Sequence, residues 1–346
     1  MDDEKFMRAA LREAQRGVGF VSPNPAVGAV IVRGGKILSR GYHHRAGEPH
    51  AEIEALRALR RPELARGATI YVTLEPCSTH GRTPPCVDAI LRAGLGRVVI
   101  GAIDPNPAHA GSGVNLLRAA GVDVSTGVLE AECRELNAIF NHWIVTKTPY
   151  VIAKAGMSLD GRLTRPPGES QWLTSEASRA DAHLLRAQVD AILVGAQTLR
   201  ADNPQLNVRG VPGARQPWRV ILTRSGDLPK SAHVFTDEHR ERTLVFPGKP
   251  LRAVLWELAQ RQITSVLIEG GMQVLGDAFD RRLVNRVHFY LAPLLSGGPV
   301  VAVGGRGAGS TAESVQIANP RYERIGSDLR MTGDAVYPDS SGAARE

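Results

Sequence analysis

The sequence predicts an α/β protein built from two domains. Apolar runs typical of buried strands alternate with helical patterns along most of the chain. The length of 346 residues is enough for two domains of ordinary size. The pattern changes after the polar stretch 146–149, which is the best linker candidate. We therefore expect domains at 1–146 and 147–338, followed by a short flexible tail at 339–346.

The expected elements of the first half form an α/β layer unit. Phe6, Met7, Ala10, Leu11 and Ala14 recur at helical spacing and Gly17 ends the run. The turn at 33–36 joins two strands as a hairpin. The sequence predicts helices at 3–16, 51–59, 87–93, 114–120 and 130–144, and strands at 27–32, 37–42, 69–74, 98–101 and 122–124.

In the second half the alternation of strands and helices favours a mostly parallel sheet. The sequence predicts strands at 150–155, 191–195, 219–223, 243–246, 265–269 and 287–292, and helices at 176–188, 251–262 and 274–281. The glycine-rich stretch 304–309 is typical of a flexible loop.

Composition narrows the class of protein. With 43% hydrophobic and 22% charged residues, the chain can bury real cores. A formal charge of +7 favours anionic partners, but the basic residues are dispersed and aromatics are only 5%, which argues against nucleic acid. Three cysteines predict a reducing compartment. The acidic N-terminus lacks an apolar signal region and no apolar run could span a membrane, so we expect a cytoplasmic enzyme without a membrane partner.

The central chemical motif is Pro49-His50-Ala51-Glu52, followed by Glu75-Pro76-Cys77 and Cys86. One imidazole and two thiolates can hold Zn²⁺ and leave a fourth position for water, whose pKa the metal lowers. Glu52 would be the proton shuttle beside the metal. His-x-Glu followed by Pro-Cys and a second Cys is the signature of zinc nucleobase deaminases. Residues two apart point away from each other on a helix, so His50 and Glu52 share a site only at a helix start.

A purely structural zinc site is the competing interpretation. Structural sites normally close with four protein ligands, and no fourth Cys or His lies at ligand spacing. Cys133 lies in a charged, helical-looking segment and is interpreted as an ordinary packed or surface thiol. The catalytic interpretation is therefore favoured.

Loops around the motif offer substrate contacts. Eight residues separate the two cysteines, instead of the two in the compact signature, and Arg82 on this loop has a donor fork suited to phosphate. Asn24, fixed between two prolines, could read a pyrimidine edge, and His43 could line the pocket. The alternatives are a solvated arginine, a simple turn residue and a solvated histidine.

Two stretches of the second half suggest ligand binding. A strand ends at Glu269 and leads through Gly270-Gly271 into a helix, an arrangement that suits a pyrophosphate but is also common as a plain turn. It lacks the full Rossmann fingerprint. The stretch 195–209 leaves a strand carboxyl end. There Asp202 and Arg209 could bind sugar and phosphate, or form an ordinary surface ion pair.

Together these motifs resemble the bifunctional deaminase–reductases of riboflavin biosynthesis. The resemblance rests on Pro-Asn-Pro-x-Val-Gly, Pro-His-Ala-Glu, Tyr-Val-Thr-Leu-Glu-Pro-Cys-Ser with Gly-Arg-Thr-Pro-Pro-Cys, and Asp-Pro-Asn-Pro in the first half. It continues in the second half with Lys-Ala-Gly-Met-Ser-Leu-Asp-Gly-Arg, Gly-Glu-Ser-Gln-Trp-Leu-Thr, Ala-Asp-Asn-Pro and Glu-Gly-Gly. The match covers nearly the whole chain.

The resemblance implies a three-layer domain similar to cytidine deaminases and a second domain similar in fold to dihydrofolate reductase. The first would hydrolyse the 2-amino group of a diaminopyrimidinone ribosyl 5′-phosphate. The second would use NADPH to reduce the ribosyl chain to ribityl. Zn²⁺ and NADPH are the implied cofactors, small phosphorylated pyrimidines the partners, and a homo-oligomer the expected assembly.

The resemblance also assigns residues. The implied zinc ligands are His50, Cys77 and Cys86, with Glu52 as proton shuttle. The implied substrate contacts are Asn24, His43, Arg82, Ser170, Arg186, Leu206, Arg209 and Glu269. The implied NADPH contacts are Gly156, Trp172, Thr174, Thr198, Asp202, Gly271, Met272 and Gln273. Lys154 and Asp202 are the candidate catalytic groups of the reductase.

One residue departs from the family pattern. Thr79 stands where the family usually has histidine, and threonine is shorter and cannot carry charge. We hypothesise that His80 or His43 covers that contact.

Two other functions compete with this interpretation. In one, the reductase half has lost its activity, which NADPH oxidation would test. In the other, the chain is a nucleic-acid editing protein, but the sequence has no basic stripe or stacking platform.

Overall fold

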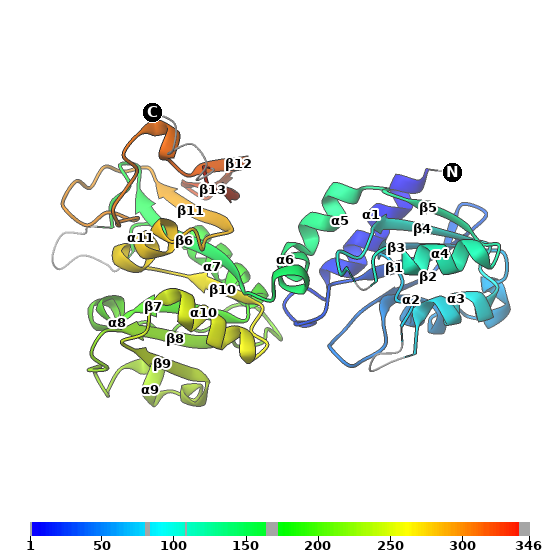
Figure 1. The fold of residues 1–346 in the computed structure, drawn as a ribbon, viewed down its shortest axis with the longest axis horizontal. Coiled ribbons are helices and arrows are strands. Elements are labelled where there is room, and N and C mark those ends of the chain that lie inside the picture. Colours follow the sequence, from blue (N-terminus) through cyan, green and yellow to red (C-terminus); the bar gives the residue numbers. More distant parts are fainter. Residues whose placement is uncertain (1, 80–83, 108, 164–171, 339–346) are drawn as a thin grey trace. The chain divides into compact units, whose positions relative to one another are not determined.

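The computed structural model describes residues 2–79, 84–107, 109–163 and 172–338. It divides the chain into two compact units, Met1–Lys147 and Thr148–Glu346 (Figure 1). The division falls one residue after the expected position. The expected tail, 339–346, lies outside the described residues.

The N-terminal unit has a five-stranded sheet in the order β2-β1-β3-β4-β5. Strand β1 is antiparallel to β2 and β3, whereas β3, β4 and β5 run parallel. The strands are β1 (Gly28–Arg33), β2 (Lys36–Tyr42), β3 (Thr69–Leu74), β4 (Arg97–Ala102) and β5 (Asp123–Thr126). The helices are α1 (Asp3–Gln15), α2 (Ala51–Arg57), α3 (Cys86–Ala93), α4 (Ser112–Ala119), α5 (Glu130–Leu136) and α6 (Ala138–Thr146), with a 3₁₀ turn η1 (Pro62–Ala65).

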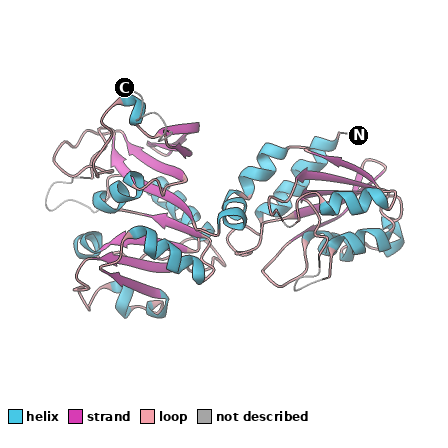
Figure 2. Ribbon diagram, viewed as in Figure 1, coloured by secondary structure: helices cyan, strands magenta, loops and turns pink. Residues whose placement is uncertain are grey.

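Small residues let helices approach both faces of this sheet. A Cβ on Gly28 would lie 2.1 Å from the Ala10 carbonyl oxygen of α1. A Cβ on Gly41 would lie 2.3 Å from the Ala55 nitrogen of α2. Gly41 pairs with Ala29, the neighbour of Gly28, and adjacent strand residues face opposite sides. Helices α1 and α2 therefore cover opposite faces, which gives the three layers expected (Figure 2).

The predicted helix 130–144 is in fact two helices, α5 and α6. Asn137 separates them with a non-helical φ of −107°. Its side chain accepts a hydrogen bond from the Ala26 nitrogen at 2.8 Å and donates one to the Ala26 oxygen at 2.9 Å. This buried side chain anchors the break between the helices to the loop before β1.

The C-terminal unit has an eight-stranded sheet in the order β12-β13-β11-β6-β10-β7-β8-β9. Strands from β11 to β9 in that order run parallel, and β13 and β12 are antiparallel. The strands are β6 (Tyr150–Ser158), β7 (Ala191–Gly195), β8 (Trp218–Thr223), β9 (Thr243–Pro247), β10 (Ser265–Ile268), β11 (Arg286–Ala292), β12 (Gln316–Ile325) and β13 (Asp328–Val336). The helices are α7 (Glu176–Gln188), α8 (Ala196–Asp202), α9 (His233–Thr236), α10 (Leu251–Gln260) and α11 (Met272–Asp280), with 3₁₀ turns η2 (Arg240–Arg242) and η3 (Thr311–Glu313).

The two faces of this sheet differ in chemistry. On one face Val151, Ala153, Val287 and Phe289 join α10 and α11 in an apolar core. The residues that alternate with them, such as Lys154 and His288, face the other side. Helix α7 packs on that second, more polar face.

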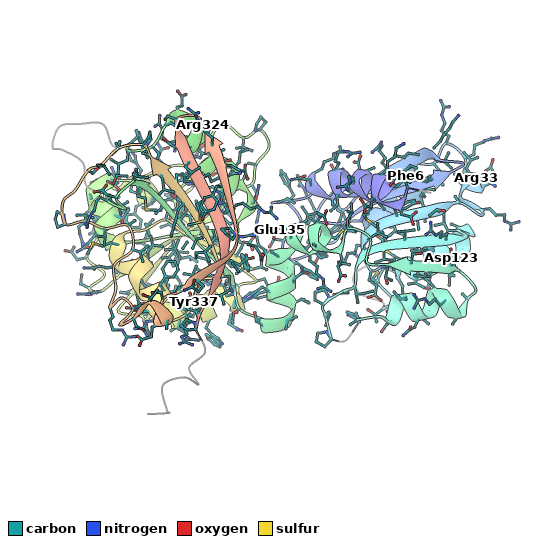
Figure 3. All side chains as sticks on the ribbon, turned by 90° about the horizontal axis from the view of Figure 1, so that it is seen from above. Phe6, Arg33, Asp123, Glu135, Arg324 and Tyr337 are labelled. Atoms are coloured by element: carbon teal, nitrogen blue, oxygen red, sulfur yellow. The ribbon has the colours of Figure 1, made fainter. Side chains whose placement is uncertain are left out.

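The hairpin formed by β12 and β13 was not expected from the sequence. Strand β12 is largely exposed and contains Pro320, so it lacks the apolar run of a buried strand. The all-atom view shows this hairpin with Arg324 on β12 and Tyr337 just after β13 (Figure 3). Strand β12 lies at the edge of the sheet and most residues on both of its faces are exposed, so its sequence carries little hydrophobic pattern.

Candidate active sites

Three side chains of the N-terminal unit meet as a potential metal site. The His50 Nδ1 atom lies 3.5 Å from the Cys77 Sγ and 3.3 Å from the Cys86 Sγ. The donor atoms of all three residues lie within 4.8 Å of one another. Three nitrogen and sulfur donors at this separation suit zinc, which accepts imidazole and thiolate in a tetrahedral set.

The fold brings these donors together at the ends of elements. His50 is the N-cap residue of α2, and Cys86 is the first residue of α3. Cys77 follows the end of β3, and its sulfur accepts a hydrogen bond from the Cys86 backbone nitrogen at 3.3 Å. Because His50 caps the start of α2, Glu52, two positions later, can face the same site.

Glu52 is buried beside the three donors. Its side chain is 3% exposed, and its Oε2 atom makes no hydrogen bond within the part of the chain that the structure describes. Burial, together with the nearby Cys77 sulfur, raises the pKa of Glu52 to about 7. A buried acid with one free oxygen suits a group that passes a proton to a bound ligand.

Hydrogen bonding around Cys77 favours metal ligation by this thiol. Hydrogen bonding from Cys86, with further help from His50, lowers the pKa of the Cys77 thiol. Cys77 is therefore held as a thiolate, the form that binds a metal. The third cysteine, Cys133 of α5, packs against Gly101 of β4, and burial raises its pKa to about 12. It is a buried core thiol.

Asn24 and His43 form a fixed pair next to the metal ligands. The His43 Nδ1 atom lies 3.0 Å from the Pro49 oxygen, which can only accept, so Nδ1 carries the proton. Burial lowers the pKa of His43, and the neutral ring therefore accepts at Nε2 from the Asn24 amide nitrogen, 3.1 Å away. Both ring nitrogens of His43 are engaged, and the amide orientation of Asn24 is set.

Glu75 organises the loop opposite Cys77 and was not assigned a role from the sequence. It is 6% exposed. Its Oε2 atom accepts from the backbone nitrogens of Asp104 and Gly111, and its Oε1 atom from those of Gly113 and Val114, at 2.9–3.3 Å. The motif itself carries no signal for this role, because the partners of Glu75 lie 29 to 39 residues further along the chain.

Arg82 and His80 lie outside the described residues, as does Ser170 of the other unit. Thr79, the departure from the family pattern, is described and exposed.

In the C-terminal unit, three predicted residues meet in a buried ion cluster. Arg186 of α7 donates to Glu269 through two nitrogens, at 2.6 and 2.8 Å. The Lys154 Nζ atom of β6 lies 3.8 Å from the Glu269 Oε2 atom. Burial would raise the pKa of Glu269, but Arg186 and Lys154 outweigh it and lower that pKa to about 2. The carboxylate between the two cations therefore stays charged.

The predicted NADPH residues lie in two close pairs and at a helix start. A Cβ on Gly156 would lie 3.1 Å from the Thr174 side chain, and one on Gly271 would lie 3.0 Å from the Thr198 hydroxyl. Met272 and Gln273 begin α11, where free backbone N–H groups favour an anion. Of the two other predicted residues, Trp172 is 55% exposed and has the Arg179 guanidinium 5.5 Å from its ring centre, and Asp202 lies in the stretch after β7.

The other predicted contacts lie in the stretch of chain that follows β7. Asp202 ends α8, and Leu206 is buried with a positive φ of 50°. Arg209 is held by the side chains of Gln205 and Asn207, each at 2.6 Å. Arg186 donates to the Asn207 backbone oxygen at 2.9 Å, which links this stretch to the ion cluster.

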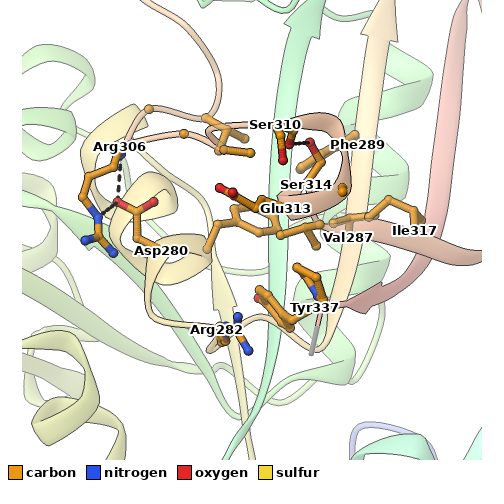
Figure 4. Close-up of a pocket in the computed structure, with 18 residues that line it drawn as sticks. Asp280, Arg282, Val287, Phe289, Arg306, Ser310, Glu313, Ser314, Ile317 and Tyr337 are labelled. Carbon is orange, nitrogen blue, oxygen red and sulfur yellow. Dashed lines mark hydrogen bonds and ion pairs between the residues drawn. The ribbon is translucent and has the colours of Figure 1, made fainter. Parts of the chain in front are cut away.

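A pocket of about 870 Å³ lies elsewhere in the C-terminal unit (Figure 4). Val287 and Phe289 of β11 line it, so it opens on the α11 face of the sheet. Asp280 accepts from the Arg306 backbone nitrogen at its edge. None of the predicted site residues lines this pocket.

Family models match both units. Residues 1–102 match the cytidine and deoxycytidylate deaminase zinc-binding region, and residues 149–330 match the RibD C-terminal domain. The riboflavin biosynthesis protein RibD of Aquifex aeolicus is 40% identical over 94% of this chain and 97% of its own length. The chain belongs to the RibD family.

Other RibD proteins agree with this membership. RibD of Escherichia coli is 42% identical over 86% of this chain and 89% of its own. The structure of Acinetobacter baumannii RibD is 37% identical, covers 96% of this chain and 99% of its own, and has a TM-score of 0.88. A Thermotoga maritima structure described as diaminohydroxyphosphoribosylaminopyrimidine deaminase/5-amino-6-(5-phosphoribosylamino)uracil reductase is 35% identical, covers 96% and 99% of the two chains, and has a TM-score of 0.86.

Membership confirms the resemblance and the fold predicted from the sequence. The chain is a bifunctional deaminase–reductase of riboflavin biosynthesis. Its first domain is a zinc-binding deaminase domain and its second a reductase domain of the NADPH-using type. Among the described residues, no helix is long and apolar enough to cross a membrane.

Proposed function

We propose that the N-terminal site removes the 2-amino group of 2,5-diamino-6-ribosylamino-4(3H)-pyrimidinone 5′-phosphate. The C-terminal site would then reduce the ribosyl chain of 5-amino-6-(5-phosphoribosylamino)uracil to ribityl. The observation that carries the first step is the meeting of His50, Cys77 and Cys86 beside the buried Glu52. The likeness to the Thermotoga maritima protein supports both substrates.

In the deamination, His50, Cys77 and Cys86 would hold zinc and Glu52 would move the proton. Zinc supplies Lewis-acid activation of water when it is bound. Glu52 takes a proton from the attacking water and gives it to the departing amino group, which leaves as ammonia. The fixed amide of Asn24 orients the pyrimidine ring, and His43 keeps that amide in place. Arg82 is proposed as the phosphate contact.

In the reduction, the buried ion cluster would act on the sugar. NADPH supplies the hydride when it is bound. The Lys154 ammonium, held near Glu269, is the proposed donor of the proton that the sugar oxygen takes up. Ser170, Arg186, Leu206, Arg209 and Glu269 are the proposed substrate contacts. The proposed NADPH contacts are Gly156, Trp172, Thr174, Thr198, Asp202, Gly271, Met272 and Gln273. Asp202 is also proposed, beside Lys154, as a catalytic polar group of the reductase.

We also propose that the enzyme works in the cytoplasm on phosphorylated pyrimidines and forms a homo-oligomer. A charge of +7 supports anionic substrates, and three cysteines support a reducing compartment. Sedimentation velocity of the full chain tests the assembly, and a monomer at micromolar concentration would contradict it.

The test of the metal site is a pair of cysteine variants. Cys77→Ser removes a ligand and is expected to lose most bound zinc and ammonia release, since three protein ligands are needed. Cys133→Ala is the matched control, because this buried thiol packs against Gly101 and not at the site. Zinc is measured by mass spectrometry and ammonia by a colorimetric assay. Full zinc content in Cys77→Ser would contradict the proposed ligand set.

A further inference from the structure

Helix α7 meets the sheet of the C-terminal unit through polar contacts. Near its start the Ser178 hydroxyl donates to Asp328 at 2.6 Å. Near its end Arg186 binds Glu269. Between these two contacts Asp181 reaches the sheet, and neither the sequence motifs nor the proposed function uses it. The buried face of α7 therefore holds a charged group whose task is unassigned.

Asp181 collects three side chains from two strands. The Tyr290 hydroxyl donates to it at 2.7 Å, and the Arg330 guanidinium lies 2.8 Å from both of its oxygens. The His288 Nε2 atom lies 3.6 Å away. Burial would raise the pKa of Asp181, but these partners outweigh burial and lower it. The carboxylate is a fixed anion that orients the Tyr290 ring.

The oriented ring lies beside Lys154. Strands β11 and β6 are parallel neighbours, with His288 opposite Lys154 and Tyr290 opposite Gly156. The Lys154 Nζ atom lies 5.9 Å from the centre of the Tyr290 ring and above its face. Tyr290 is 1% exposed and the Lys154 side chain 19%, so the ring is shielded from water and the ammonium largely so. The Glu269 Oε2 atom lies 3.8 Å from the same ammonium.

We propose that Tyr290, held by Asp181, is a positioning residue that keeps the Lys154 ammonium charged and directed toward Glu269. A cation within about 6 Å of an aromatic face is attracted by the ring quadrupole, most strongly where solvent is excluded. The hydrogen bond to Asp181 fixes the plane of the ring and so the direction of this attraction. The inference rests on the proposed role of Lys154 as proton donor.

The other charges around Lys154 show why this ring matters. Burial lowers the pKa of Lys154, Glu269 raises it and Arg186 lowers it. Arg186 also neutralises much of Glu269, through two hydrogen bonds. His288 is kept neutral because burial lowers its pKa. Among the described residues, Asp181 and His183 of α7 and Arg330 of β13 also face this region. Loss of the ring would leave Lys154 with less to favour its charged form.

The experiment compares Tyr290→Leu with Tyr290→Phe in the full-length enzyme. The readout is the pH dependence of kcat for NADPH oxidation with the deaminated substrate, whose alkaline limb reports loss of the acid. Tyr290→Leu removes the ring, so the Lys154 pKa falls. The alkaline limb should therefore shift to lower pH, by about half a pH unit to one unit. Tyr290→Phe keeps the ring and loses only the hydrogen bond to Asp181, so its limb should lie between those of the wild type and Tyr290→Leu. Tyr322→Leu, an exposed tyrosine on β12, is the control.

Two further variants keep the outcome decisive. If Tyr290→Leu does not fold, 3,4,5-trifluorophenylalanine at position 290 is compared with Tyr290→Phe, since fluorine weakens the ring quadrupole with little change in shape. With the fluorinated ring, the alkaline limb should again shift to lower pH. Lys154→Met separates the two proposals. If it retains activity and the same limb, the proposed role of Lys154 fails. If it abolishes turnover while Tyr290→Leu and the fluorinated ring keep the wild-type limb, the positioning role is overturned.

Discussion

Single residues decide the chemistry of the N-terminal site. His50, Cys77 and Cys86 bring three donor atoms within 4.8 Å, and Glu52 is buried next to them. Asn24 is fixed by His43, whose second nitrogen is taken by Pro49. A substrate ring that enters this site meets an amide that is already oriented. The entropic cost of positioning the ring is therefore lower.

At the same scale, Thr79 tests how the site tolerates a change from the family pattern. Thr79 is exposed, and because both ring nitrogens of His43 are engaged, we hypothesise that His80 supplies the contact of the usual histidine. Thr79→His is then expected to change deaminase kcat/KM by less than tenfold, or about 1.4 kcal/mol in the barrier. Ammonia release at limiting substrate measures it, with Thr79→Ser as the control. A rise well beyond tenfold would mean that no neighbour compensates.

At the scale of elements, the loop before α4 depends on Glu75. Its two oxygens accept four backbone N–H groups. Glu75→Gln turns one oxygen into an amide donor, so two backbone donors lose their acceptor. Each costs about 1–3 kcal/mol when buried. We expect a lower Tm for the N-terminal unit by calorimetry. Glu63→Gln, at an exposed position, is the control, and equal Tm values for the two variants would contradict this role.

The sequence predicted elements best where their apolar pattern was strong. Buried strands such as β3 and β7 were placed at their observed bounds, because every residue in them is buried. The hairpin β12–β13 was missed, because an exposed edge strand with Pro320 has no such pattern. The break at Asn137 was missed because it depends on a contact with Ala26, which is distant in sequence.

The residues of the two sites also differ in how far the sequence predicts them. The zinc donors were predictable because the metal restricts residue type and spacing. Glu75 and Asp181 were not given roles, since their partners are backbone groups and side chains from elements far along the chain. Tyr290 was predicted only as part of the strand 287–292. Its local sequence pattern does not distinguish a tyrosine that contacts a lysine from an ordinary core residue. Long-range polar contacts are the part that local pattern does not encode.

At the scale of the whole molecule, two compact units carry two separate sets of residues. We therefore expect zinc removal to affect one activity only. A chelator such as dipicolinate should abolish ammonia release and lower the Tm of the N-terminal unit, since a ligand of the native state stabilises it. NADPH oxidation with the deaminated substrate should persist. Restoration of ammonia release by added Zn²⁺ is the control, and a parallel loss of both activities would contradict independence of the units.

The most direct test of the account is a paired assay of the wild type and Glu52→Gln. Ammonia release is followed with the diaminopyrimidine phosphate, and NADPH consumption is followed separately with the deaminated substrate. We predict that Glu52→Gln lowers ammonia release by about 10²–10⁴-fold, the usual contribution of a general acid–base group, and leaves NADPH consumption unchanged. If Glu52→Gln retains full ammonia release with zinc bound, the buried carboxyl is not the proton shuttle and the proposed deaminase mechanism is wrong.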